Sequence, residues 1–173
     1  REEQFVLLIV GWRLDEEISD EFLQMLDSVC RKDARIVAAF MGKYQNYEES
    51  IKKYPLLAAN SRCLGAQEDA LAVTECMDLY VNPKRNGGGS SVAEALYKGL
   101  PAVTLPVGDV SAAAGESFRV ADYGEMAETI LHFASDEDYY ERMSRLAEER
   151  AEQLMDSKNS FCGVIDELEQ DMN

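Results

Sequence analysis

Residues 78–101 read DLYVNPKRNGGGSSVAEALYKGLP, and this stretch contains the pattern on which the fold depends. The apolar residues of 78–81 predict a buried strand, and residues 90–98 predict a helix. Between them, Gly87–Gly89 let the backbone turn sharply and let a ligand approach the main chain, because glycine has no Cβ. A helix start presents free N–H groups and the positive end of its dipole, which together bind phosphate. The stretch therefore predicts a strand, a glycine-rich loop and an anion-binding helix start.

Polar side chains flank this loop on both sides. The hydroxyls of Ser90 and Ser91 add donors at the helix start, and Lys84 and Arg85 add the positive charge that a diphosphate needs. Glu94 lies about one turn further along the helix, where a carboxylate can accept hydrogen bonds from ribose hydroxyls. The glycine spacing differs from those of the P-loop and of the dinucleotide-binding turn. Taken alone, these residues also fit a plain strand-to-helix turn. In such a turn a serine caps the helix, and the carboxylate of Glu94 interacts favourably with the positive end of the helix dipole.

The rest of the chain alternates between apolar runs and helical periodicity. Three-to-four spacing of apolar residues predicts helices, and short continuous apolar runs predict strands that are buried on both faces. This order predicts an α/β fold, a Rossmann-like three-layer arrangement in which a parallel sheet has helices on both faces. The predicted strands are 5–10, 35–40, 61–64, 78–81, 102–105 and 117–120, and the predicted helices are 16–30, 68–77, 90–98, 124–134, 136–155 and 160–171. A polar, tyrosine-rich stretch at 43–54 ends at Pro55, the helix at 68–77 is expected to turn Leu71 inward, and residues 106–109 are expected to form a turn.

Composition excludes several classes of protein. The 173 residues contain 17 Lys and Arg against 33 Asp and Glu, a net charge of −16, which argues against binding to nucleic acid or to anionic membrane surfaces. No apolar run is long enough to span a bilayer, and we expect a cytoplasmic protein. The cysteines are scattered and far from His132, so we expect reduced, mostly buried thiols and no metal site; they are Cys30, Cys63, Cys76 and Cys162. Because the sequence begins at Arg1 just before a strand, we expect residues 1–173 to be one domain excised from a longer chain.

Several of these motifs together resemble a known family. Pro83, the loop Asn86–Gly89, the pair Glu94-Ala95 and the stretch Gly99–Val103 are similar to the C-terminal, nucleotide-sugar-binding domain of GT-B-fold glycosyltransferases of the "group 1" type. Further matches are the first strand with its turn at Gly11 and Arg13, the Leu64-Gly65 pair, and the helical pattern after Gly115. The resemblance covers most of the chain and implies one half of a GT-B fold.

The resemblance also implies roles for individual residues. The diphosphate would be held by Gly87, Gly88, Gly89, Ser90 and Ser91, the ribose by Glu94 and the base by the region of Gly65. Gly11 would also line the nucleotide-sugar site, and Arg13 beside it would approach the phosphates. Lys84, Arg85 and Asn86 would contact the donor and its leaving diphosphate. No metal or other cofactor is implied.

The chain departs from the family pattern at two places. Asn86 stands where the family has its first glutamate, eight residues before the second. Asp15, Glu16 and Glu17 stand where a lysine usually follows the arginine of the first turn. The departures weaken the case for the usual retaining mechanism and leave the donor site in place.

The resemblance predicts a metal-independent glycosyltransferase domain that binds a UDP- or GDP-sugar for transfer to a glycan or another acceptor. A missing N-terminal domain would hold the acceptor, so the isolated chain is expected to be inactive. One alternative is half of a nucleotide-sugar epimerase, which would convert the sugar without an acceptor. The other is a degenerate, non-catalytic domain that binds a partner protein, which the two departures favour.

Overall fold

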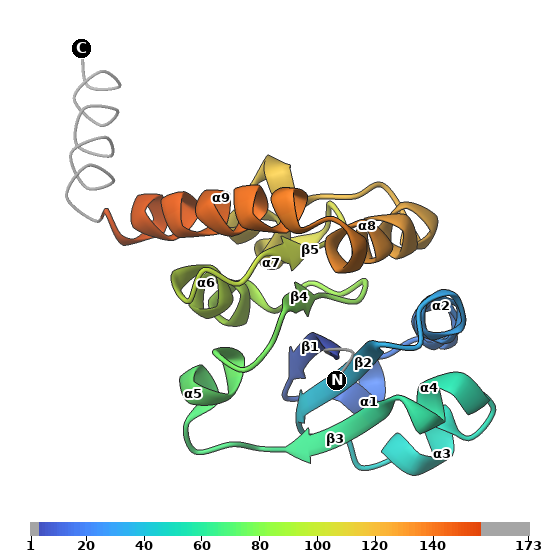
Figure 1. Ribbon diagram of the computed structural model, residues 1–173. Coiled ribbons are helices and arrows are strands. Elements are labelled where there is room, and N and C mark those ends of the chain that lie inside the picture. Colours follow the sequence, from blue (N-terminus) through green and yellow to red (C-terminus); the bar gives the residue numbers. More distant parts are fainter. Residues whose placement is uncertain (1–3, 157–173) are drawn as a thin grey trace.

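The computed structural model describes residues 4–156. Its sheet has five strands, all parallel, in the order β3-β2-β1-β4-β5 (Figure 1). The strands are β1 (Phe5–Gly11), β2 (Ile36–Gly42), β3 (Ser61–Gly65), β4 (Leu79–Val81) and β5 (Ala102–Val103). The helices are α1 (Leu14–Glu17), α2 (Asp20–Lys32), α3 (Tyr47–Ile51), α4 (Pro55–Ala59), α5 (Ala70–Thr74), α6 (Gly89–Tyr97), α7 (Gly108–Ala114), the 3₁₀ helix η1 (Glu116–Phe118), α8 (Tyr123–Ser135) and α9 (Glu137–Met155).

The central strand β1 is an unbroken run of apolar residues, which favours burial at the centre of the sheet. Leu7, Leu8 and Ile9 are at most 1% exposed, as expected of a strand that is covered on both faces. In Figure 1, α5 and α6 lie on one side of the strands, and α2 with α8 lies on the other. The predicted α/β class, with a parallel sheet between two layers of helices, is confirmed.

The strand order creates one special position at the edge of the sheet. The chain adds β2 and β3 on one side of β1 and then returns to add β4 and β5 on its other side. In open α/β sheets, ligands bind at the carboxyl ends of the strands where the order reverses. We therefore expect a ligand site between the turn after β1 and the loop after β4.

Two predicted elements are wrong in detail. The strand expected at 117–120 is a 3₁₀ helix at Glu116–Phe118 followed by a single bridge from Arg119 to Thr104, because Gly115, with φ +86°, turns the chain directly after α7. The helix expected at 16–30 is broken in two. Ser19 is extended there, and its hydroxyl accepts the amide of Phe22 at 3.2 Å, which starts α2 as a new helix.

Three further helices, α3, α4 and α7, were not predicted from the sequence, and α3 lies within the tyrosine-rich stretch. Pro55 ends the tyrosine-rich stretch as expected and also begins α4, since proline is well tolerated in the first turn of a helix. Residues 106–109 were expected to form a turn, but Gly108 begins α7. Leu71, expected to face inward from α5, is 36% exposed.

The cysteines differ from the expectation as well. Cys30 is buried, and burial raises the pKa of its thiol to about 12. Cys63 and Cys76 are exposed, so the expectation of mostly buried thiols is wrong, although all three are free. Cys162 and the helix predicted at 160–171 lie outside the described residues. None of the helices between residues 4 and 156 is long and apolar enough to cross a membrane.

Candidate donor site

The loop after β4 approaches the start of α6 through a glycine that no other residue could replace without strain. Gly88 precedes the helix with φ +112°, in the left-handed region. A Cβ at Gly88 would lie 2.8 Å from Asn82 Oδ1 and 3.1 Å from Arg85 Nη2. A Cβ at Gly87 would instead meet no atom within 4 Å. The backbone is thus tightly packed on its inner side and open at Gly87.

The turn after β1 is equally tight. A Cβ at Gly11 would collide with Arg85 Nη1 and would lie 2.6 Å from Leu14 Cδ2. The carbonyl of Gly11 accepts the amide of Lys43 at 3.1 Å, which joins this turn to the end of β2. The ends of β1 and β4 therefore meet around the side chain of Arg85.

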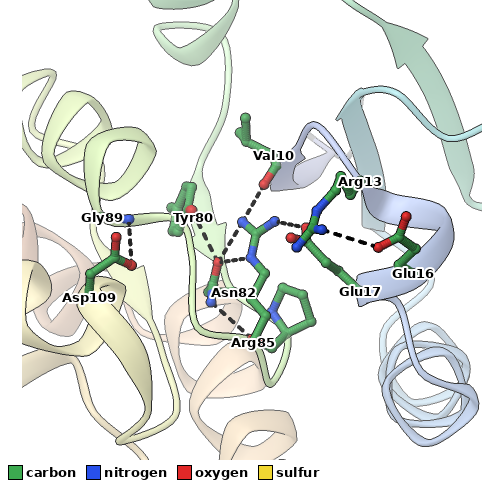
Figure 2. Close-up of polar contacts among 10 residues, drawn as sticks. Val10, Arg13, Glu16, Glu17, Tyr80, Asn82, Arg85, Gly89 and Asp109 are labelled. Carbon is green, nitrogen blue, oxygen red and sulfur yellow. Dashed lines mark hydrogen bonds and ion pairs between the residues drawn. The ribbon is translucent and has the colours of Figure 1, made fainter.

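Arg85 connects these segments through its guanidinium group (Figure 2). Nη1 donates to Glu17 Oε2 at 2.5 Å, Nη2 donates to the carbonyl of Val10, and Nε and Nη2 donate to Asn82 Oδ1 at 3.0 and 2.8 Å. The side chain of Arg85 is only 6% exposed and that of Glu17 is 16% exposed. A guanidinium with this many fixed partners is oriented rigidly. Arg85 was predicted to contact the leaving diphosphate, and here its charge is matched by Glu17.

The neighbours of this network are also buried. Tyr80 in β4 is fully buried, and its hydroxyl donates to Asn82 Oδ1 at 3.3 Å. Burial raises the pKa of Tyr80, while Arg85 and the hydroxyl of Ser91 act in the opposite direction. Ser91, which was predicted to face the diphosphate, is half-buried.

The first turn of α6 already has an acidic neighbour. The first bond within the helix joins Val92 N to Gly88 O, so the amides of Gly89, Ser90 and Ser91 precede it. The amide of Gly89 donates to Asp109 Oδ1 at 3.2 Å (Figure 2). Asp109 was not predicted from the sequence as a site residue. Its position after β5, at the same edge of the sheet, could have indicated it.

Arg13 follows β1, whereas Lys84 and Asn86 belong to the loop after β4. Arg13 is exposed and forms an ion pair of 3.4 Å with Glu16, one of the three acids that replace the expected lysine. Lys84 is exposed, and its backbone amide donates to the hydroxyl of Tyr123 at 2.9 Å. It borders a cavity of about 200 Å³ with residues of the turn after β5. Asn86 is exposed, and its carbonyl accepts the amide of Asp109 at 3.1 Å.

The remaining predicted residues are dispersed along the edge of the sheet at which the strands have their carboxyl ends. Ser90 and Glu94 are exposed on α6, with Glu94 about one and a half turns past Gly89. Gly65 ends β3 with φ +69°, and a Cβ there would meet no atom within 4 Å. β2 lies between β3 and β1 in the sheet, so Gly65 is at the same edge as Gly11 but not beside it. Within residues 4–156, no group of three or more His, Cys, Asp or Glu side chains is arranged to hold a metal ion.

Solved structures share this fold. A mutant O-GlcNAc transferase of Thermobaculum terrenum aligns over 97% of this chain and 36% of its own, with a TM-score of 0.78 and 16% identity. Anabaena HepE in complex with UDP aligns over 97% of this chain and 49% of its own, with a TM-score of 0.75 and 15% identity. A C-terminal domain of a group 1 glycosyl transferase from Francisella tularensis aligns over 87% of this chain and 86% of its own, with a TM-score of 0.71 and 14% identity.

The chain therefore spans about a third to a half of the two longer proteins and most of the single domain. No curated protein matches the sequence significantly. The model of the family described as "glycosyl transferases group 1" matches residues 4–136, which is most of the chain. Together with the parallel sheet and the glycine-rich loop at its switch point, this match shows that the chain belongs to the group 1 glycosyl transferases.

Proposed function

We propose that this chain is the donor-binding domain of a glycosyltransferase and that it binds a nucleoside-diphosphate sugar at the carboxyl ends of β1 and β4. The observation that carries the proposal is the meeting of two glycine turns and a helix start at the point where the strand order reverses. Open space at Gly87 allows a phosphate to approach the main chain, and the amides of Ser90 and Ser91 precede the first bond within α6.

Each part of the donor has a counterpart along this edge. The diphosphate would lie against Gly87 and the amides of Gly89, Ser90 and Ser91, with Arg13 and Lys84 as exposed cations at the same edge of the sheet. Glu94 would accept the ribose hydroxyls, and the open surface at Gly65 would receive the base. The UDP in the Anabaena structure supports uracil as the first base to test.

In the proposed reaction, this donor-binding domain would stabilise the charge on the departing diphosphate. Backbone amides and a helix dipole supply such stabilisation without a metal ion, and they act most strongly where water is excluded. The acceptor and the closing wall of the cleft would come from an N-terminal domain, so the chain alone would bind the donor without transferring its sugar. The acceptor class we propose is a glycan.

Titration calorimetry of the chain with UDP, GDP and their sugar conjugates tests the donor site. Gly87→Val should abolish binding without lowering stability, because its new side chain would point into the space left for the phosphate. Glu94→Ala should weaken binding by at least tenfold, since two hydrogen bonds to a carboxylate are lost. Glu128→Ala, an exposed glutamate on α8, is the matched control and should bind as the unchanged chain does.

Binding that survives both Gly87→Val and Glu94→Ala would overturn the assignment of the site. Failure of the folded chain to bind any of these nucleotides at millimolar concentration would overturn the proposed function for this chain.

A non-catalytic donor-like domain is the second candidate, and the charges of the site favour it. Glu17 neutralises the buried Arg85, and Asp109 occupies the amide of Gly89, so neither the guanidinium nor that amide is free for a diphosphate. Under this alternative, the protein joined to its acceptor domain would neither hydrolyse nor transfer a nucleotide sugar. Release of UDP or GDP from such a sugar would exclude this candidate.

A further inference from the structure

We propose that Asp109 is an internal competitor of the donor diphosphate: its carboxylate occupies the anion position at the start of α6 and must turn away before the diphosphate binds. This inference rests on the proposed donor site. It assigns to Asp109, the second residue of α7, a role in setting donor affinity, which the family resemblance does not assign to this residue.

The contact that carries the inference is direct. Asp109 Oδ1 accepts the amide of Gly89 at 3.2 Å, at the first residue of the nine-residue helix α6. The carboxyl carbon of Asp109 lies 3.0 Å from the point where a Cβ of Gly89 would stand, so the group fills the space in front of that residue. One amide hydrogen cannot be given fully to a carboxylate and a phosphate oxygen together, and two anions at this distance repel each other.

Backbone contacts hold the main chain of Asp109 in place, so only its side chain can move away from the Gly89 amide. Asp109 N donates to the carbonyl of Asn86 at 3.1 Å. Gly108, with φ +72°, packs so closely on Asn86 that a Cβ would lie 2.6 Å from its Cα. The start of α7 therefore stays attached to the glycine-rich loop, while the exposed side chain of Asp109 remains able to rotate into solvent.

This arrangement gives the site two states that differ by one side-chain rotation. In one, the carboxylate of Asp109 accepts the Gly89 amide. In the other, the diphosphate takes that amide and Asp109 faces water. The return of the carboxylate would also favour release of the nucleoside diphosphate after transfer, when the sugar no longer holds it.

Asp109→Asn tests the inference, because the amide keeps the shape of the side chain and an oxygen for the Gly89 amide but removes the charge. UDP should bind this variant about tenfold more tightly, which corresponds to about 1.4 kcal/mol. Uridine, which has no phosphates, should bind both proteins equally. Asp136→Asn is the matched control: it removes the same charge from a carboxylate that accepts the amide of Tyr139 at 2.8 Å, at the start of α9.

The outcomes separate this inference from the proposed function. Tighter UDP binding by Asp109→Asn but not by Asp136→Asn supports the inference, as does binding by Asp109→Asn alone. Equal or weaker UDP binding by Asp109→Asn, with binding by the unchanged chain intact, overturns the inference and leaves the donor site standing. Equal tightening by both variants assigns the effect to net charge and also overturns it. If neither the unchanged chain nor Asp109→Asn binds UDP or GDP, the inference is overturned together with the proposed function.

Discussion

A single arginine holds together the two turns that border the candidate site. The guanidinium of Arg85 contacts the end of β1 at Val10, the helix α1 at Glu17 and the end of β4 at Asn82. Its atoms also lie where side chains at Gly11 and Gly88 would have to be. The two glycines are therefore required by the same buried cation, and the shape of the site depends on a pair of charges that the solvent hardly reaches.

Arg85→Met should destabilise the chain by about 3 kcal/mol, because it leaves the carboxylate of Glu17 without its partner in a largely buried position. Combining it with Glu17→Met should recover at least about 1 kcal/mol of that loss, since both charges are then removed together. Urea unfolding of the single and double variants measures the coupling between the two residues.

The control for this cycle is the exposed ion pair of Lys52 and Glu49, whose side chains are 74% and 80% exposed. Its coupling should stay below about 0.5 kcal/mol, as is usual for surface pairs. Additive effects of Arg85→Met and Glu17→Met would show that the buried pair does not act as a unit.

The elements themselves show which parts of the fold depend on local sequence and which on packing. The helix α6 was predicted because a glycine-rich loop and two serines precede a run of good helix formers. The helix α7 was missed because Gly108 and Asp109 are typical turn residues. It forms because Val110 and Ala114 are buried at 1% exposure, and such tertiary burial overrides local propensity.

The junction between α1 and α3 should respond to acid through Asp15. The amides of Asn46 and Gln45 donate to the carboxylate of Asp15 at 2.7 and 3.0 Å and hold its pKa below the ordinary value of 3.8. A folded-state pKa below the unfolded one stabilises the fold above the unfolded value, and this contribution is lost as the pH falls through the folded pKa.

The free energy of unfolding should therefore fall more steeply below about pH 4 in the unchanged chain than in Asp15→Asn. An NMR titration checks the cause, because the amide shifts of Gln45 and Asn46 should follow the carboxyl shift of Asp15 with one midpoint below 3.8. A midpoint at or above that value would show that the two amides do not stabilise the charged form.

At the scale of the whole molecule, the sequence predicted the layers and the edge of the sheet but not the contacts that shape the site. Alternating apolar runs and helical patterns sufficed for the parallel sheet, and the glycine-rich loop pointed to its carboxyl edge. The pair of Arg85 and Glu17 joins residues 68 positions apart, and Asp109 reaches Gly89 across 20 positions. Such contacts leave no local pattern, because the topology brings their partners together only after folding.

The net charge of −16 predicts how salt concentration affects the binding of UDP. This excess of acidic residues repels a nucleoside diphosphate, and Asp109 beside the Gly89 amide adds to the repulsion, whereas Arg13 and Lys84 are exposed cations at the same edge of the sheet. Raising the salt from about 0.01 to about 0.15 M shortens the Debye length from about 30 to about 8 Å and screens the distant acids more than the cations at the site. UDP binding should therefore tighten on the order of threefold over this range, as measured by calorimetry at constant pH. Weaker binding at the higher salt would mean that Arg13 and Lys84 dominate the field at the site.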